Sequence, residues 1–247
     1  MDLKNIFDLL AVFLLGIGFL IGWYRGFLNT VINVVSLFVA WLAAFLFNGP
    51  LAALFNAKTN LGQTLLYYTA GAEKLSDMTV ANTDVASLSV ERIHSIIETS
   101  ALPQPMANQL EYNIVNQVFF KDGITTLSDY FNQTLINLTL HLISFLLIYL
   151  VIRIVLGFLI ELYDHSFRLP VLRHGDSVFG GLFGLLHGAM IAFVVFSVLP
   201  VLATVLDLSS ITLPGTDQNL ALALEKSSLG GFFYHANIIF NVLSGRL

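Results

Sequence analysis

The sequence predicts an all-α, polytopic membrane protein with four transmembrane helices, a helical extramembrane insert between the second and third, and an amphipathic C-terminal helix. Hydrophobic residues make up 56 % of the 247 residues and charged residues only 11 %, and the mean hydropathy is +0.80, values outside the usual soluble range. Four long intervals also lack Asp, Glu, Lys and Arg, and each could cross about 30 Å of hydrocarbon. We therefore expect one membrane domain over residues 1–247.

The transmembrane spans are predicted from these intervals, at about residues 6–24, 27–47, 138–160 and 177–199. The first interval could be a signal peptide, but its apolar stretch is longer than usual and no small-residue cleavage site follows it, so we expect a retained helix. Only Arg25 and Gly26 separate the first two spans, so we predict that these helices form a tight hairpin and lie antiparallel as neighbours. Pro200 is expected to bend or end the fourth span.

The segment 48–134 is polar and is predicted to lie in water or at the membrane interface. Apolar residues recur in it at helical spacing, which indicates short amphipathic helices. Thr126, with Asp129 three residues later, is typical of a helix cap and predicts a helix start leading into the third span.

The C-terminal tail, 207–247, is predicted to be loop-like from Leu208 to Gly231, where Pro and Gly punctuate the chain. An amphipathic helix is expected at about 229–244, lying on the bilayer surface or covering the bundle. Packing as part of a soluble domain is the alternative for this helix.

The orientation in the membrane follows from Lys and Arg in the short connections. Arg25 lies in the first short connection, and Arg168 and Arg173 lie in the second, so parity places all three on one side. The positive-inside rule assigns that side to the cytoplasm, with the N-terminus, the insert and the C-terminus outside. Lys residues near the opposite helix ends weaken this signal.

Small residues let transmembrane helices approach closely, and two spans carry glycine at every fourth position. These glycines are Gly18, Gly22 and Gly26 in the first span and Gly180, Gly184 and Gly188 in the fourth. The predicted topology places both glycine stripes at matching depth, where they could pack face to face within one chain. A contact between copies in a homo-oligomer is the alternative.

Several local motifs resemble those of CvpA, the colicin V production protein family. They are Phe7-Asp8, the turn Arg25-Gly26-Phe27, and Gly175-Asp176 followed by the glycine-spaced run 180–188. The resemblance covers the order of all four spans. Members often have Arg-Glu where this chain has Asn29-Thr30, and Arg where it has His187. The resemblance implies an inner (cytoplasmic) membrane protein linked to bacteriocin production and envelope function, without a defined reaction.

Catalytic motifs were sought and none was found: the chain has no G-x-S-x-G, H-E-x-x-H, phosphate-binding loop or C-x-x-C. The lack of cysteine excludes disulfides and thiolate metal sites, and the six histidines lack ligand spacing. The net charge is −5 and no basic cluster occurs, which argues against nucleic acid as a partner. We expect no enzyme activity, no cofactor and no metal.

Polar residues inside the spans are the remaining candidates for a functional site, because ionisable groups are costly in lipid. Asn33, Arg153 and His187 fall at similar depth in three spans. They could form a small polar site or water-filled vestibule in the cytoplasmic half. Alternatively, Arg153 reaches the surface along its own stem and His187 bonds a neighbouring helix as a neutral imidazole.

These observations favour a non-enzymatic scaffold or export accessory for a secreted peptide toxin or another envelope component. The expected partners are the lipid bilayer, a secretion or envelope protein, and a second copy of the chain in a homo-oligomer. A small-solute transporter or channel, acting as an oligomer, is the alternative, and a membrane enzyme is a weaker third.

Overall fold

The computed structural model describes residues 3–100, 102–167, 176–205 and 220–236, which are largely helical and form no β-strand beyond an isolated bridge at Asp84 and Thr126. Four of the described helices are long and apolar enough to cross a membrane. The predicted all-α membrane fold is therefore confirmed.

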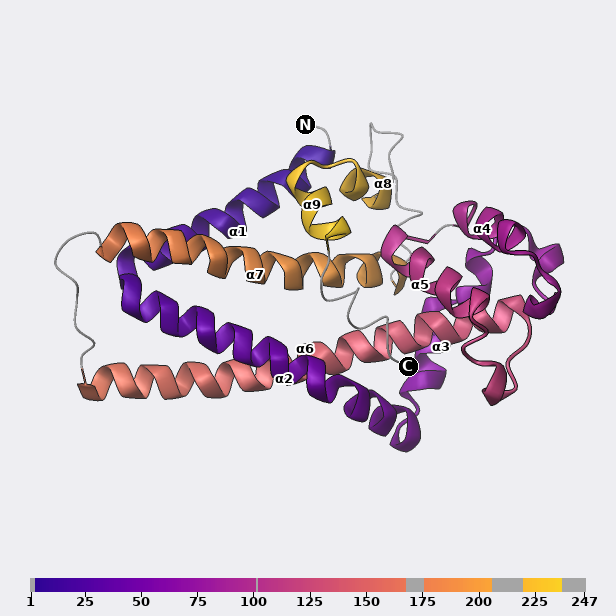
Figure 1. Ribbon diagram of the computed structural model, residues 1–247, viewed down its shortest axis with the longest axis horizontal. Helices are drawn as coiled ribbons and strands as arrows, with labels where there is room; N and C mark the ends of the chain where they lie inside the picture. The colour runs from indigo at the N-terminus through magenta and orange to yellow at the C-terminus, as the bar shows by residue number, and fades with distance from the viewer. Residues whose placement is uncertain (1–2, 101, 168–175, 206–219, 237–247) are drawn as a thin grey trace.

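The four long helices are α1 (Leu3–Arg25), α2 (Phe27–Lys58), α6 (Leu127–Phe167) and α7 (Asp176–Val205). Helix α7 runs between α1 and α2, and α2 crosses α6 (Figure 1). Helices α1 and α2 form the predicted hairpin but touch little beyond it, because α1 packs mainly on α7. The expected pairing of the first two helices as neighbours thus holds only near their turn.

The long helices extend past the predicted span limits. Helix α2 continues through Pro50 to Lys58, so residues 48–58, predicted as part of the insert, belong to this helix. Helix α7 passes Pro200 and reaches Val205, so of the two predicted effects, a bend or an end, Pro200 does not end the helix. Helix α6 has 41 residues. At 1.5 Å per residue it measures about 60 Å, twice a hydrocarbon core of about 30 Å.

The insert is helical, as predicted. It contains α3 (Leu61–Thr69), α4 (Val90–Glu98), α5 (Gln104–Val115) and short 3-10 helices at Gly71–Lys74, Met78–Val80, Val85–Ser87 and Phe120–Asp122. Apolar side chains from α4 and α5 join the first residues of α6 in a core of their own, which includes Ile97, Leu110 and Phe131. The insert therefore folds around the end of α6 that extends beyond the predicted span.

The predicted helix start at Thr126 is confirmed. The Thr126 hydroxyl accepts the backbone N–H of Asp129 at 3.3 Å and donates to the Asp129 carboxylate at 2.7 Å. These two bonds satisfy groups that the first turn of α6 would otherwise leave unpaired.

Two short helices follow the fourth span in the described part of the tail: α8 (Leu220–Glu225) and α9 (Leu229–His235). They pack against α1 and α7, and Phe7, Phe196 and Phe233 share one buried cluster there. The prediction of a loop from Leu208 to Gly231 is therefore wrong at α8. Helix α9 covers the bundle, which is one of the two positions expected for the C-terminal helix. The rest of the predicted helix 229–244 lies outside the described residues.

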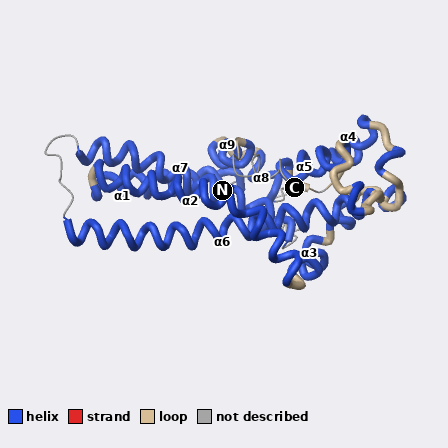
Figure 2. Tube along the Cα trace, turned by 60° about the horizontal axis from the view of Figure 1, so that its bottom comes forward, coloured by secondary structure: helices blue, strands red, loops and turns tan. Residues whose placement is uncertain are grey.

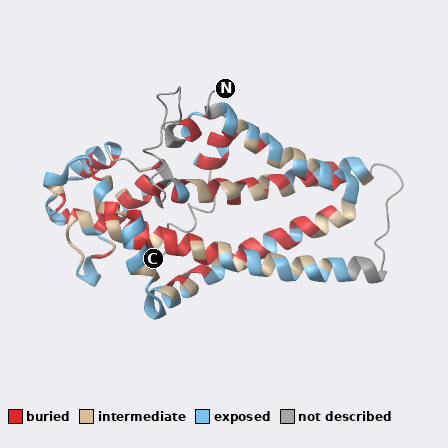
Figure 3. Cartoon of the chain, turned by 180° about the vertical axis from the view of Figure 1, so that it is seen from behind, coloured by how far each residue is buried: buried red, intermediate tan, exposed pale blue. Residues whose placement is uncertain are grey.

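The C-terminal half of α6 has fewer packing neighbours than the other long helices. Its end toward Phe167 stands apart from α1, α2 and α7 (Figure 2). Seen from behind, buried residues gather where α2, α6 and α7 cross and in the insert (Figure 3). Ile154 and Phe158 are 70 % and 69 % exposed, which suits contact with lipid.

Candidate functional site

The two glycine stripes face each other across α1 and α7. A Cβ on Gly18 would overlap the carbonyl oxygen of Gly184 and lie 2.8 Å from the Cα of Gly188. A Cβ on Gly22 would overlap the carbonyl oxygen of Gly180 in the same way. The two backbones are therefore in direct contact within one chain, over the stretch that we call the glycine seam: Gly18, Gly22, Gly180, Gly184 and Gly188.

The turn at Gly26 explains why two distant motifs occur together. Gly26 has φ 78°, a conformation that side chains with a Cβ rarely adopt, and a Cβ there would overlap the Asp176 carboxylate. That carboxylate accepts the backbone N–H of Phe27 at 3.1 Å. Asp176, at the start of α7, thus caps the first turn of α2 and joins the Arg-Gly-Phe turn to the Gly-Asp motif.

Asp8 makes the equivalent contact at the other end of α1. Its carboxylate accepts the backbone N–H groups of Leu229 at 2.6 Å and Gly230 at 3.1 Å, at the start of α9. No local pattern pairs Asp8 or Asp176 with these helices, since their partners lie 149 to 222 residues away.

The intramembrane polar residues contact one another in part. The Arg153 guanidinium donates to Asn33 Oδ1 at 3.1 Å and to the Ser36 hydroxyl at 3.2 Å, both on α2. Asn33 Nδ2 donates to the Asn29 backbone carbonyl at 2.9 Å, which leaves Oδ1 as the acceptor for Arg153. Arg153 of α6 is therefore bound to α2 through neutral side chains.

His187 lies beside this pair in a small pocket. The pocket is lined by Asn33, Arg25, Thr30 and residues of α1, and Arg153 is not among them. Its volume of about 10 Å³ is close to the minimum for one water molecule. Asn33 thus lines the pocket together with His187 and also accepts from Arg153, but the space is far smaller than a vestibule.

Three further positions predicted from the sequence are the arginines of the short connections. Arg25 ends α1 at the hairpin, on the same pocket as His187. Arg168 and Arg173 lie outside the described residues. Within the described ranges, no group of three or more His, Asp or Glu side chains is arranged to hold a metal ion.

A second polar pair went unnoticed in the sequence. His141 Nδ1 and Asn48 Oδ1 are 2.7 Å apart, and both residues are buried between α2 and α6. The sequence signal for this pair was one polar residue among several on each helix, which periodicity cannot connect. Only the crossing of α2 over α6 brings them together.

The comparisons with known proteins give one match. The family model described as Colicin V production protein matches residues 7–79 and 95–212, which include the hairpin, Asp176 and most of all four long helices. No curated protein and no solved structure matches the chain.

Proposed function

Because the chain belongs to the colicin V production protein family, we propose that it is a non-enzymatic scaffold or export accessory of the cytoplasmic membrane. In this role it would hold a secretion or envelope protein while a peptide toxin, or another envelope component, leaves the cell. The family assignment agrees with the resemblance in the local motifs around Gly26 and Asp176.

One observation favours the scaffold over the transporter: the described spans pack closely around the polar residues. Backbones touch along the glycine seam, and the pocket at Asn33 and His187 holds about 10 Å³. A single copy therefore offers little room for a solute beside Asn33 and His187, whereas a closely packed bundle with exposed apolar faces suits the binding of another membrane protein.

Crosslinking from the lipid-facing side tests this role. A photoreactive residue at Ile154 or Phe158 should attach a secretion or envelope protein in cells that release a colicin V-type peptide. The same probe at Leu37, which is 0 % exposed, is the matched control and should attach none. Removal of the captured protein should then block toxin release. Capture of the chain's own copies alone at the exposed positions would contradict the scaffold.

A comparison of one packing variant with one polar variant should distinguish the scaffold hypothesis from the transporter hypothesis. Gly184→Leu would drive α1 from α7 and should abolish toxin release, while His187→Leu should leave release intact. The opposite pattern would exclude the scaffold.

The alternative, a small-solute transporter or channel formed by an oligomer, is favoured by one feature. Arg153 is only partly buried on α6, although it lies well inside a predicted span. If a second copy packed on this face of α6, the Arg153 guanidinium would line a solute path between the two copies. Uptake or efflux in reconstituted vesicles that is lost in Arg153→Met and Asn33→Leu would support this alternative.

A further inference from the structure

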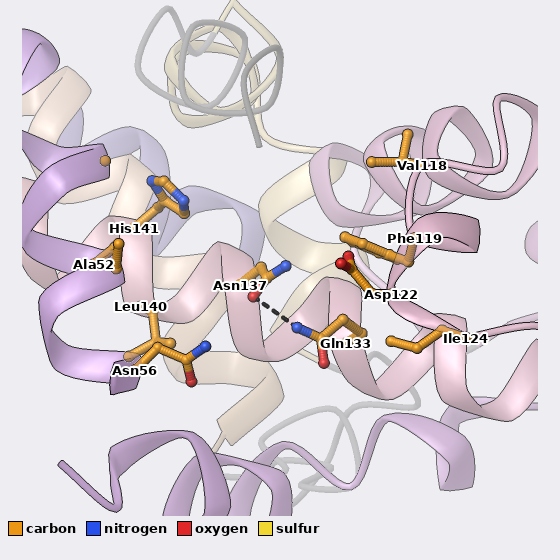
Figure 4. Close-up of a pocket in the computed structure, with 12 residues that line it drawn as sticks. Ala52, Asn56, Val118, Phe119, Asp122, Ile124, Gln133, Asn137, Leu140 and His141 are labelled. Carbon is orange, nitrogen blue, oxygen red and sulfur yellow. Dashed lines mark hydrogen bonds between the residues drawn. The ribbon is translucent and has the colours of Figure 1, made fainter. Parts of the chain in front are cut away.

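A cavity opens where the spans meet the insert. It measures about 630 Å³ and is bounded by α2 beyond Gly49, by α6 before His141, and by the segment 118–124 (Figure 4). This size is in the range of small-molecule sites. Its walls lie beyond the predicted second span and around the predicted start of the third, which is the level at which we expect lipid headgroups.

His141 contributes a hydrogen-bond acceptor to the cavity wall. Asn48 Nδ2 donates to the backbone carbonyls of Ala44 at 3.1 Å and Phe45 at 2.8 Å, so Asn48 Oδ1 is the acceptor in the 2.7 Å contact with His141. The neutral His141 ring therefore carries its hydrogen on Nδ1. Its Nε2 is left as an acceptor.

Gln133 and Asp122 add further acceptors. Gln133 Nε2 donates to Asn137 Oδ1 at 3.1 Å, which leaves Gln133 Oε1 available (Figure 4). Asp122 supplies a carboxylate from the opposite wall. Among the described residues that line the cavity, Asp122 carries the one formal charge, and none is Lys or Arg. The Asp122 carboxylate thus favours a ligand that carries positive charge and donates hydrogen bonds, and the wall offers no cationic group to a phosphate.

We propose that this cavity binds a primary ammonium group, with its N–H donors directed to Asp122 and Gln133. Apolar side chains of Ala52, Leu140 and Ile124 would contact the carbon chain attached to that group. Two sources share this chemistry: the headgroup of an aminophospholipid such as phosphatidylethanolamine, and a soluble alkylamine. The site is independent of the proposed scaffold role, because it faces the insert and not the lipid-exposed side of α6.

Lipid retention by the purified full chain tests the proposal. Native mass spectrometry would compare phosphatidylethanolamine with phosphatidylcholine of the same acyl chains, since methylation removes the N–H donors and keeps the charge. The wild type should retain the ethanolamine lipid about tenfold more than the choline lipid, as expected for hydrogen bonds to charged groups. Asp122→Asn and Gln133→Leu should each lower this preference.

The matched control is Glu73→Gln, which removes an exposed carboxylate of the insert that does not line the cavity. It should keep the wild-type preference. Thermal unfolding of every variant separates loss of the ligand from loss of the fold, and the exposed Asp122 gives a variant expected to fold normally.

A second measurement separates the two sources. In nanodiscs of phosphatidylcholine alone, butylamine should raise the unfolding temperature more than the butyltrimethylammonium ion if the natural ligand is a soluble amine. Lipid preference without this effect assigns the site to an aminophospholipid. If the wild type prefers neither amine over its methylated counterpart, or if Asp122→Asn keeps the full preference, the proposal is wrong.

Discussion

At the residue scale, glycine is needed where two backbones touch. Gly18 and Gly22 face carbonyl oxygens of α7 so closely that even a methyl group would require the helices to move apart. Because lipid provides no hydrophobic drive for helix association, the packing along this seam is a main source of the attraction between α1 and α7.

Replacement of Gly22 by Ala should therefore destabilise the bundle. Overpacking against Gly180 should cost about 1–3 kcal/mol, measured by reversible unfolding in mixed micelles. Gly16→Ala is the control in the same helix, because a Cβ there meets nothing within 4 Å. Equal stability of the two variants would show that the seam does not hold α1 on α7.

At the element scale, α9 is fixed to α1 through the Asp8 carboxylate. Asp8→Ala should remove the acceptor for Leu229 and Gly230 and cost about 1 kcal/mol, as the loss of a helix cap does. Faster amide exchange confined to α8 and α9 is the expected readout. Asp8→Asn keeps an acceptor oxygen and should retain most of the protection. Uniform exchange changes across the whole bundle would contradict this local role.

The contact between α4 and α5 should depend on pH. His94 lies 3.1 Å from Glu111 and 3.1 Å from Glu98, and the hydrogen bond to Glu111 followed by the charge of Glu98 raises the pKa of His94 above its ordinary 6.5. A raised pKa in the folded state adds stability below 6.5 that is lost as the pH rises through the higher value.

Amide exchange in α4 and α5 should thus be slower at about pH 6 than at about pH 8, after correction for intrinsic rates. His94→Gln should remove this difference. A pH dependence that persists in His94→Gln would assign the effect to other groups.

At the scale of the whole molecule, we expect the N-terminus and the C-terminus to lie outside, as the Lys and Arg residues of the short connections predict. The chain has no cysteine, so each introduced cysteine is a unique label site. Tyr24→Cys, at an 86 % exposed position beside the hairpin, should react with an impermeant maleimide only after permeabilisation. Lys121→Cys in the insert should react in intact cells. The reverse pattern would invert the topology.

The sequence by itself determined the four long helices and the helical insert, because hydrophobic length and apolar periodicity are local properties. It also predicted the start of α6, where Thr126 and Asp129 are only three residues apart. The ends of α2 and α7 were less predictable, because both helices continue past a proline.

The glycine stripes of the first and fourth spans already suggested one helix contact, but only the tertiary structure decided where polar groups of different helices meet. Packing brings Asp176 to Phe27, 149 residues away, and pairs His141 with Asn48, 93 residues away. The cavity between α2, α6 and the segment 118–124 also forms only in the folded chain, from segments that share no sequence pattern. Hydrophobicity specifies that a segment enters the membrane, but the choice among apolar neighbours depends on shape and hydrogen bonding between surfaces that meet only in the folded chain.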